Sequence, residues 1–417
     1  MLSLPLTEPT LRKLTMYLAA MLFLHIFLAW HTWGGVLVGL PDFSIFYTAG
    51  EILHEGRGFE LYDDVVQEKV QRSFSPVAYE KRQSVLPYNH PPFEALIFIP
   101  FIRLPYTAAY LVWLAINLGL MLAVLILLRK NFAILGSAPL YVWLLAGFGF
   151  YPLFIALIQG QDSVLVLFCY AMAFLAFRRR AESLAGAWAG VGLCKPQLIL
   201  PFAFPLALVR RRFLVGFLSV GFVLFLLGLA AVGWRGWLRY PLYVWAGENV
   251  QSYAWLSAVG NAPNLRGLVA SLCPAGTPRL RTGLTLLASA IVLASVTYAW
   301  RQALLTVAVY RDLLFALSLV ATALVSYHIY VHDLSVLFLP ALIVLEVSLS
   351  SEEIHSWAKR TLYGCIGVLF CSPLYLLLTL RYKKGELIGG VILIFFAILL
   401  IEFLQNQPRK RGTPETA

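Results

Sequence analysis

Asp42 is the first residue whose type and position suggest chemistry. It directly follows a long apolar run, in the string PDFSIFYTAGEILHEG, so its carboxylate is expected at or just inside a membrane boundary. A carboxylate at that depth is costly unless it has a partner or a function. Asp is also a favoured N-cap, and a helix starting near Ser44 would give Asp42 a purely structural role. The residues alone support the catalytic and the capping role about equally.

Lys195 stands in the string GVGLCKPQLILPF, within a stretch of otherwise uncharged residues. An ammonium group there needs an anion or a path to water, and a bound phosphate would satisfy it. The alternatives are a lysine that reaches from a helix end to water, or one paired with Asp42 or Asp162 for stability alone. We favour the phosphate.

The string SYHIYVHDLSVLFLP brings together His328, His332 and Asp333. The two histidines are four positions apart and share one face if that turn is helical. Two His and one Asp are possible metal ligands, but no further residue with metal-site spacing accompanies them. We therefore predict no metal here. Two other interpretations of these residues remain. They either act on a sugar hydroxyl as a base or hydrogen-bonding group, or they simply form a polar helix end.

Composition places these residues in a membrane protein. Of the 417 residues, 60% are hydrophobic and 13% are charged, which excludes an ordinary soluble domain. The net charge of +11 comes from Arg and Lys clusters at the ends of apolar runs, which indicates cytoplasmic loops rather than nucleic-acid binding. The five cysteines lack metal-site spacing and are expected to be packing residues.

The apolar runs predict an all-α polytopic bundle of about 10 to 13 transmembrane helices in one domain, residues 1–417. The expected helices cover residues 14–40, 93–128, 139–158, 162–177, 182–209, 212–233, 279–300, 311–330, 334–350, 359–380 and 386–404. The segment 182–209 has basic clusters at both ends, so it should be a hairpin broken at Lys195 and Pro196.

The basic clusters put the N-terminus and a tail, residues 405–417, in the cytoplasm of a multi-pass plasma-membrane protein. Loops 41–92 and 234–278 then lie on the external face, and loop 41–92 should carry an interfacial helix. Loop 234–262 is rich in Trp and Tyr, including Tyr240, Tyr253 and Trp255. These rings suit either sugar stacking or an interfacial aromatic belt.

No Walker A, GxGxxG, GxSxG or HExxH string is present, so ATP hydrolysis, dinucleotide redox chemistry and the common hydrolase mechanisms lack support. Other strings give a positive resemblance. They are DFSIFYTAG after Pro41, YNHPP from Tyr88, GQ at Gly160, KPQ at Lys195, and the segments 264–267 and 326–333. In this order they resemble glycosyltransferase family 87, the GT-C mannosyl- and arabinofuranosyltransferases that use polyprenyl-phosphate sugars.

The resemblance implies a GT-C-type bundle with its active site on the external face and no cofactor. It makes Asp42 the general base, with His332 as the second catalytic residue. Lys195 and Gln161 are then expected to bind the donor phosphate. The residues expected to bind substrate are Tyr47, His90, His328, Asp333, Asn264 and Arg266. The chain departs from the family where AsnAlaProAsn, ending at Asn264, replaces a more usual Asn-Gln-Ser, and where His332 and Asp333 replace a paired His or Tyr-Asp.

The expected activity is therefore inverting transfer of a sugar, mannose first and arabinofuranose second, from a polyprenyl-phosphate donor to a hydroxyl of a lipid or glycan acceptor. The expected partners are that donor, the acceptor and membrane lipids, with no nucleic acid. The alternative is a polytopic transporter or glycolipid flippase, which would also have broken helices and buried charge. No inverted internal repeat is visible, and the long loop after Asp42 favours the enzyme.

Overall fold

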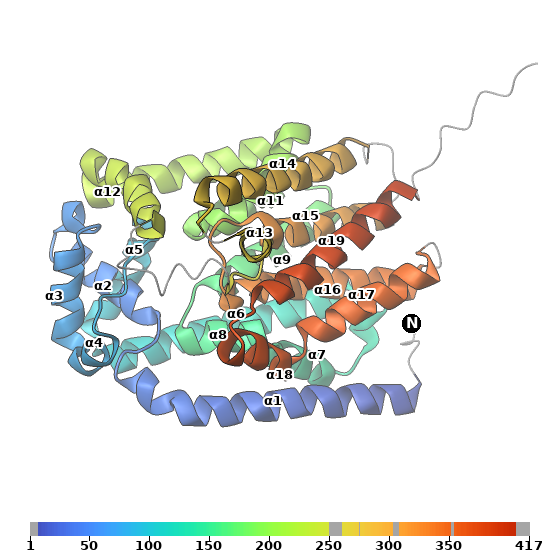
Figure 1. Ribbon diagram of the computed structural model, residues 1–417, viewed down its shortest axis with the longest axis horizontal. Coiled ribbons are helices and arrows are strands. Elements are labelled where there is room, and N and C mark those ends of the chain that lie inside the picture. Colours follow the sequence, from blue (N-terminus) through green and yellow to red (C-terminus); the bar gives the residue numbers. More distant parts are fainter. Residues whose placement is uncertain (1–6, 250–260, 275, 303–307, 352–353, 406–417) are drawn as a thin grey trace, which may run out of the picture.

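The computed structural model describes residues 7–249, 261–274, 276–302, 308–351 and 354–405. Within these ranges the chain is helical, with turns between helices and no strand (Figure 1). The predicted tail 405–417 lies outside them apart from its first residue, and so do Tyr253 and Trp255.

The α-helices run in the following order along the chain. They are α1 (Glu8–Leu37), α2 (Phe43–His54), α3 (Asp64–Phe74), α4 (Pro76–Arg82), α5 (Pro92–Phe98), α6 (Tyr106–Asn131), α7 (Leu140–Phe148), α8 (Tyr151–Gln159), α9 (Ser163–Arg178), α10 (Glu182–Val191), α11 (Pro196–Val209), α12 (Arg211–Asn249), α13 (Leu265–Leu272), α14 (Pro278–Gln302), α15 (Ala308–Val325), α16 (Phe338–Ser350), α17 (Ser356–Leu369), α18 (Ser372–Tyr375) and α19 (Glu386–Gln405).

The chain is an all-α polytopic membrane protein, as predicted. Among the described residues, six helical segments are long and apolar enough to cross a membrane, and up to eight if each of two bent pairs counts as one span. This is fewer than the 10 to 13 predicted, because several apolar runs are divided into short helices. Two of these, α9 and α11, are apolar but shorter than 18 residues.

Proline accounts for the most visible division. The sequence predicted one long helix over 93–128, whereas the chain forms α5, a 3-10 segment (Ile99–Arg103) and then α6. Pro100 and Pro105 lack the N–H that a continuous helix requires, so the chain turns there. The α7/α8 pair and the pair formed by α17 with Ser372–Arg381 are each bent by 66°.

Helix α12 continues where the sequence predicted a loop. The expected helix ended at residue 233, and the helical conformation is indeed interrupted there, at Gly233, whose φ of 69° favours glycine. A second helical stretch follows this kink and runs to Asn249. The first part of the predicted external loop 234–278 is therefore helical. Near the start of α12, Gly216 lies so close to the backbone of Ser183 on α10 that any side chain would collide with it. Such small residues let apolar helices pack closely.

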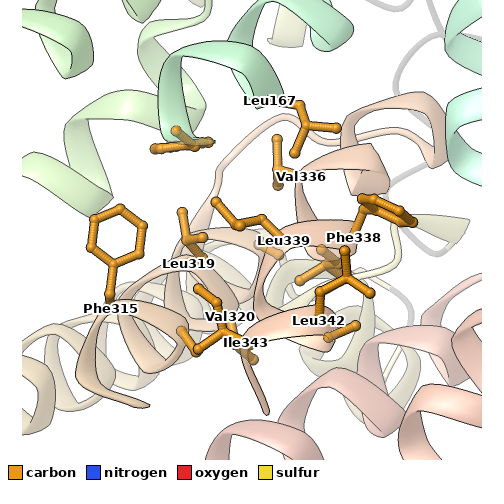
Figure 2. Packing of buried hydrophobic residues seen from close by; sticks show 14 of the residues in the cluster. Leu167, Phe315, Leu319, Val320, Val336, Phe338, Leu339, Leu342 and Ile343 are labelled. Carbon is orange, nitrogen blue, oxygen red and sulfur yellow. The ribbon is translucent and has the colours of Figure 1, made fainter. Parts of the chain in front are cut away.

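Helices α9, α15 and α16 contribute many residues to the core of the bundle. Leu167, Phe315 and Leu339 belong to one cluster of fully or nearly fully buried apolar residues. Figure 2 shows Phe315 and Leu319 of α15 facing Val336 and Leu339 of the next segment. The start of α9 and the segment leading into α16 both carry polar residues, and this packing fixes them relative to each other.

The segment after α1 forms its own group of short helices, α2 to α5, which lies at one end of the molecule (Figure 1). The helix predicted near Ser44 is present as α2. Arg82, at the end of α4, donates hydrogen bonds to the carbonyl oxygens of Gly39 and Leu40 at 3.1 and 3.2 Å. This contact anchors the backbone immediately before Asp42.

Candidate active site

The predicted break in segment 182–209 is present, and it places the buried cation Lys195 at the site. Helix α10 ends at Val191, a 3-10 turn (Gly192–Cys194) follows, and α11 begins at Pro196. Pro196 occupies the first helical position, where its missing N–H costs nothing. Lys195 therefore sits between the two helices, and its side chain is 2% exposed.

Lys195 is held by three oxygen atoms from two segments, the turn at residues 161–162 and the segment around Asp333. Its Nζ lies 2.7 Å from Oδ1 of Asp333, 3.1 Å from Oδ1 of Asp162 and 2.9 Å from Oε1 of Gln161. The contacts with Asp333 and Gln161 are hydrogen bonds, and the contact with Asp162 is an ion pair. Asp162 had been expected as one of two structural partners, and the other, Asp42, is not in direct contact.

Gln161 links Lys195 to Asp42. While its Oε1 accepts from Lys195, its Nε2 donates to Oδ2 of Asp42 at 2.8 Å. A second glutamine, Gln159, accepts a hydrogen bond from the backbone N–H of Asp42 through Oε1 at 3.1 Å. The turn after α8 thus fixes both the backbone and the carboxylate of Asp42.

The Asp42 side chain makes no capping hydrogen bond to α2, although the residue stands at the N-cap position. Its φ of −62° and ψ of −18° are helical rather than the extended values usual for an N-cap. The first turn of α2 is closed by backbone carbonyls instead, with Pro41 accepting from Ser44 and Asp42 from Ile45. The capping interpretation therefore loses its support, and the carboxylate is directed to Gln161.

The late histidine segment differs from the sequence-based interpretation in one respect. Helix α15 ends at Val325 and the 3-10 segment η8 (Val331–Leu337) begins after His328, so the two histidines do not share a helical face. Both nevertheless reach the same cavity. His332 Nε2 lies 3.5 Å from Oδ2 of Asp333, which also accepts from the backbone N–H of Tyr330 at 3.1 Å.

A further carboxyl group, Glu94 on α5, joins the site without having been predicted. His90 Nδ1 lies 2.8 Å from Oε2 of Glu94 and 3.8 Å from Oδ2 of Asp162. The signal for it in the sequence was the four-residue spacing from His90 to Glu94 across two prolines. Because α5 begins at Pro92, both side chains meet Asp162 below the cavity.

Burial and neighbouring charges shift the pKa values of Lys195, Glu94 and His90. Burial would lower the pKa of Lys195, but the Asp162 and Asp333 carboxylates raise it above its ordinary value. Burial raises the pKa of Glu94 well above its usual range, and the charge of Asp162 adds to this. Burial lowers the pKa of His90 to about 4, so its ring is neutral near pH 7.

The cavity to which these residues contribute is open to solvent, and the space not filled by protein atoms, including open solvent, is about 990 Å³. Its lining combines acidic, basic and aromatic side chains from segments that are far apart in the sequence. The lining residues are Asp42, Ile45, Leu86, Pro87, Asn89, His90, Gln161, Cys194, Lys195, Pro196, Gln197, Tyr240, Val244, Tyr327, His328, Tyr330, His332 and Asp333.

Comparison with protein families gives one match. The model of the family described as glycosyltransferase family 87 matches residues 88–340, which is more than half of the chain. The chain belongs to glycosyltransferase family 87. Comparison with curated protein sequences and with solved structures gives no match.

Membership of family 87 makes the protein a glycosyltransferase, as predicted. The matched range includes His90, Gln161, Lys195 and His332, so most of the cavity lies within it. Asp42 lies before the matched range, and its assignment rests on the resemblance of its own string and on its contact with Gln161.

Three of the residues that we expected to bind substrate in this family 87 enzyme are not among those that line the cavity. Tyr47 donates to the carbonyl oxygen of Leu104 at 2.9 Å, away from Gln161. Asn264 caps α13 by accepting from the Gly267 N–H at 3.1 Å. Arg266 lies over the ring of Tyr327 at 3.9 Å. In this geometry Arg266 supports a lining residue, whereas Tyr47 and Asn264 connect segments of the chain, since Asn264 Nδ2 also donates to the carbonyl oxygen of Ser326.

Proposed function

We propose that this family 87 enzyme transfers a sugar from a polyprenyl-phosphate donor to a hydroxyl group of a lipid or glycan acceptor, with inversion at the anomeric carbon. The observation that carries the proposal is the placement of Asp42, whose carboxylate lines the cavity and is oriented by Gln161 instead of capping its helix. Mannose is the first donor sugar to test and arabinofuranose the second.

The reaction is a single displacement. The acceptor oxygen attacks the anomeric carbon, its proton passes to the Asp42 carboxylate, and the bond from that carbon to the phosphate oxygen breaks. A carboxylate is a weak base towards an alcohol, so the contribution of Asp42 is positioning, together with the rising acidity of the hydroxyl during attack. The hydrogen bond from Gln161 supplies that positioning.

The leaving lipid phosphate gains negative charge, and Lys195 and His332 are the groups proposed to stabilise it. Lys195 is already engaged, so a phosphate oxygen must replace one of its three partners. The neutral Gln161 oxygen is the least costly to displace, because Asp162 and Asp333 carry charge. His90, His328 and Asp333 then remain in the cavity for the sugar hydroxyls, and Tyr240 is available for stacking.

We further propose that the cavity opens on the external face. Helix α9 has 16 residues, so it places Asp162, which pairs with the cavity residue Lys195, about 24 Å from the basic cluster at residues 178–180. The positive-inside rule assigns that cluster to the cytoplasm, which leaves the cavity on the other side with the short helices α2 to α5.

Single cysteines test this orientation. In a variant lacking the five native cysteines, Val65→Cys on α3 should react with an impermeant thiol reagent added to intact cells, and Arg179→Cys should react only after the membrane is opened. Both positions are exposed, so accessibility of the side chain does not limit either reaction. The opposite labelling pattern would place the cavity in the cytoplasm.

The transporter interpretation makes a different prediction from the enzyme. Mass spectrometry of glycolipids from cells with and without the protein should reveal a species that carries one additional sugar only when the protein is present. A transporter would change where a glycolipid is found without creating a new mass, and that result would reject the proposed function.

A further inference from the structure

Three buried side chains, one of which (His90) also lines the cavity, converge on one point. His90 precedes α5, Glu94 lies in its first turn, and Asp162 precedes α9, and their exposed fractions are 7%, 1% and 1%. One ligand atom from each residue lies within 4.8 Å of the other two. The proposed sugar transfer uses none of the three as a base or as a phosphate ligand, apart from a sugar contact by His90.

Three of the four carboxylate oxygens in this group lack a hydrogen bond; the fourth, Oε2 of Glu94, pairs with Nδ1 of His90 at 2.8 Å. Oε1 of Glu94 and both carboxylate oxygens of Asp162 accept none, although Lys195 approaches Oδ1 of Asp162 at 3.1 Å. A buried acceptor left without a partner costs about 1–3 kcal/mol, and more if it is charged. Oδ2 of Asp162 is the oxygen on the side of His90. The open acceptors therefore face the same point as the imidazole nitrogen.

The charges of the buried groups also favour a bound cation at this point. Lys195 brings one positive charge against the carboxylates of Asp162 and Asp333, and Glu94 adds another buried acidic group beside Asp162. A positive ion at this point would both balance the acids and occupy the open acceptors.

We propose that His90, Glu94 and Asp162 bind a divalent transition-metal ion, with Mn²⁺ and Zn²⁺ as the candidates. One imidazole nitrogen with two carboxylates suits such ions better than Mg²⁺ or Ca²⁺, which prefer oxygen ligands alone. Ligand bonds of about 2.0–2.2 Å place neighbouring ligand atoms about 3 to 3.6 Å apart. The distances of 2.8 and 3.8 Å from His90 Nδ1 to the two carboxylates bracket that range.

From the sequence we expected no metal ion, because the candidate ligands considered were His328, His332 and Asp333. The group found here joins His90 and Glu94 to an aspartate about 70 positions away, a juxtaposition that only the fold creates. If the proposed sugar transfer is correct, the bound ion would also add positive charge near the donor phosphate, where Asp162 and Asp333 offset that of Lys195.

The test measures metal binding without any donor. Purified full-length protein is treated with a chelator, and Mn²⁺ is then titrated while electron paramagnetic resonance reports the free ion. We expect one Mn²⁺ per chain, displaced by Zn²⁺. Loss of an outer hydrogen-bond partner already weakens metal sites by about 10- to 100-fold, so Glu94→Gln and His90→Gln, each of which removes a ligand, should weaken binding by about 10-fold or more.

His355→Ala is the matched control. It removes another histidine paired with a carboxylate, His355 Nδ1 to Glu402 Oε1 at 3.0 Å, which connects α17 and α19. Mn²⁺ affinity should not change in this variant. If the ligand variants fail to fold, the number of Mn²⁺ ions bound per wild-type chain still tests the proposal.

Absence of stoichiometric Mn²⁺ or Zn²⁺ binding by the wild-type protein would overturn the proposal, as would equal affinity in Glu94→Gln. An infrared band of a protonated carboxyl group, present in the wild type at saturating Mn²⁺ and lost in Glu94→Gln, would identify a proton as the occupant instead. These results do not depend on sugar transfer, so failure of the metal site and failure of the proposed function are distinguishable.

Discussion

Asp42→Asn is expected to lower turnover by about 100-fold or more, because it removes the proton acceptor while preserving the shape of the side chain. The amide oxygen of the substituted side chain can still accept the hydrogen bond that Gln161 Nε2 makes to Oδ2 at 2.8 Å. Since the native side chain does not cap α2, thermal stability should change little. Sugar transfer from a synthetic polyprenyl-phosphate donor measures turnover, alongside donor binding and melting of the purified protein.

Asp63→Asn is the matched control for this experiment. Asp63 does cap a helix, since its Oδ1 accepts from the backbone N–H groups of Val65 and Val66 at 3.0 and 3.3 Å. The same substitution there should leave turnover intact, with a small change in stability at most. Near-normal turnover in Asp42→Asn would remove Asp42 from the mechanism and direct attention to Asp333 and His332.

Lys195→Met should destabilise the protein strongly, by about 3–5 kcal/mol, because it leaves the buried carboxylates of Asp162 and Asp333 without their cation. The added substitution Asp333→Asn should recover part of that loss by removing one of the unpaired charges. Thermal denaturation in detergent compares the single and double variants with the wild type.

Arg72→Met provides the surface comparison. Its guanidinium pairs with Glu68 at 3.2 Å, but the side chains are 57% and 38% exposed. Exposed pairs of this kind contribute about 0.2–1 kcal/mol, so the melting temperature should change far less than in Lys195→Met. Equal shifts in the two variants, or no recovery in the double variant, would mean that Lys195 is not the centre of a buried ion network.

The features that could be predicted from the sequence are local ones. Pro196 beside Lys195 breaks its segment as expected, and the apolar spacing after Asp42 forms α2. The predicted helix end at residue 233 coincides with the non-helical Gly233, but the loop predicted directly after it was wrong, because helix resumes beyond the kink and runs to Asn249. Helical spacing between His328 and His332 was wrong, since a non-helical turn separates α15 from η8.

The contacts that decide the roles of the site residues are not local. The choice between capping and catalysis for Asp42 depends on Gln161, which is 119 positions away, and Lys195 meets Asp333 across 138 positions. Residue patterns along the chain do not predict which helix ends lie next to each other in the fold. The sequence indicated that Lys195 needs an anion, but it offered only Asp42 and Asp162 as candidate protein partners. The sequence did not identify Glu94 as a site residue.

The central claim is that the donor is a lipid-linked sugar phosphate, and the most direct measurement supplies the purified wild-type protein with one donor at a time. The donors are polyprenyl-phosphate mannose, polyprenyl-phosphate arabinofuranose and the corresponding nucleotide sugar, each with a membrane lipid extract as acceptor. Mass spectrometry should detect a glycosylated lipid with one of the polyprenyl-phosphate donors and none with the nucleotide sugar, and the new linkage should have the inverted anomeric configuration. Transfer from the nucleotide sugar, or no transfer from either lipid-linked donor, would contradict the account.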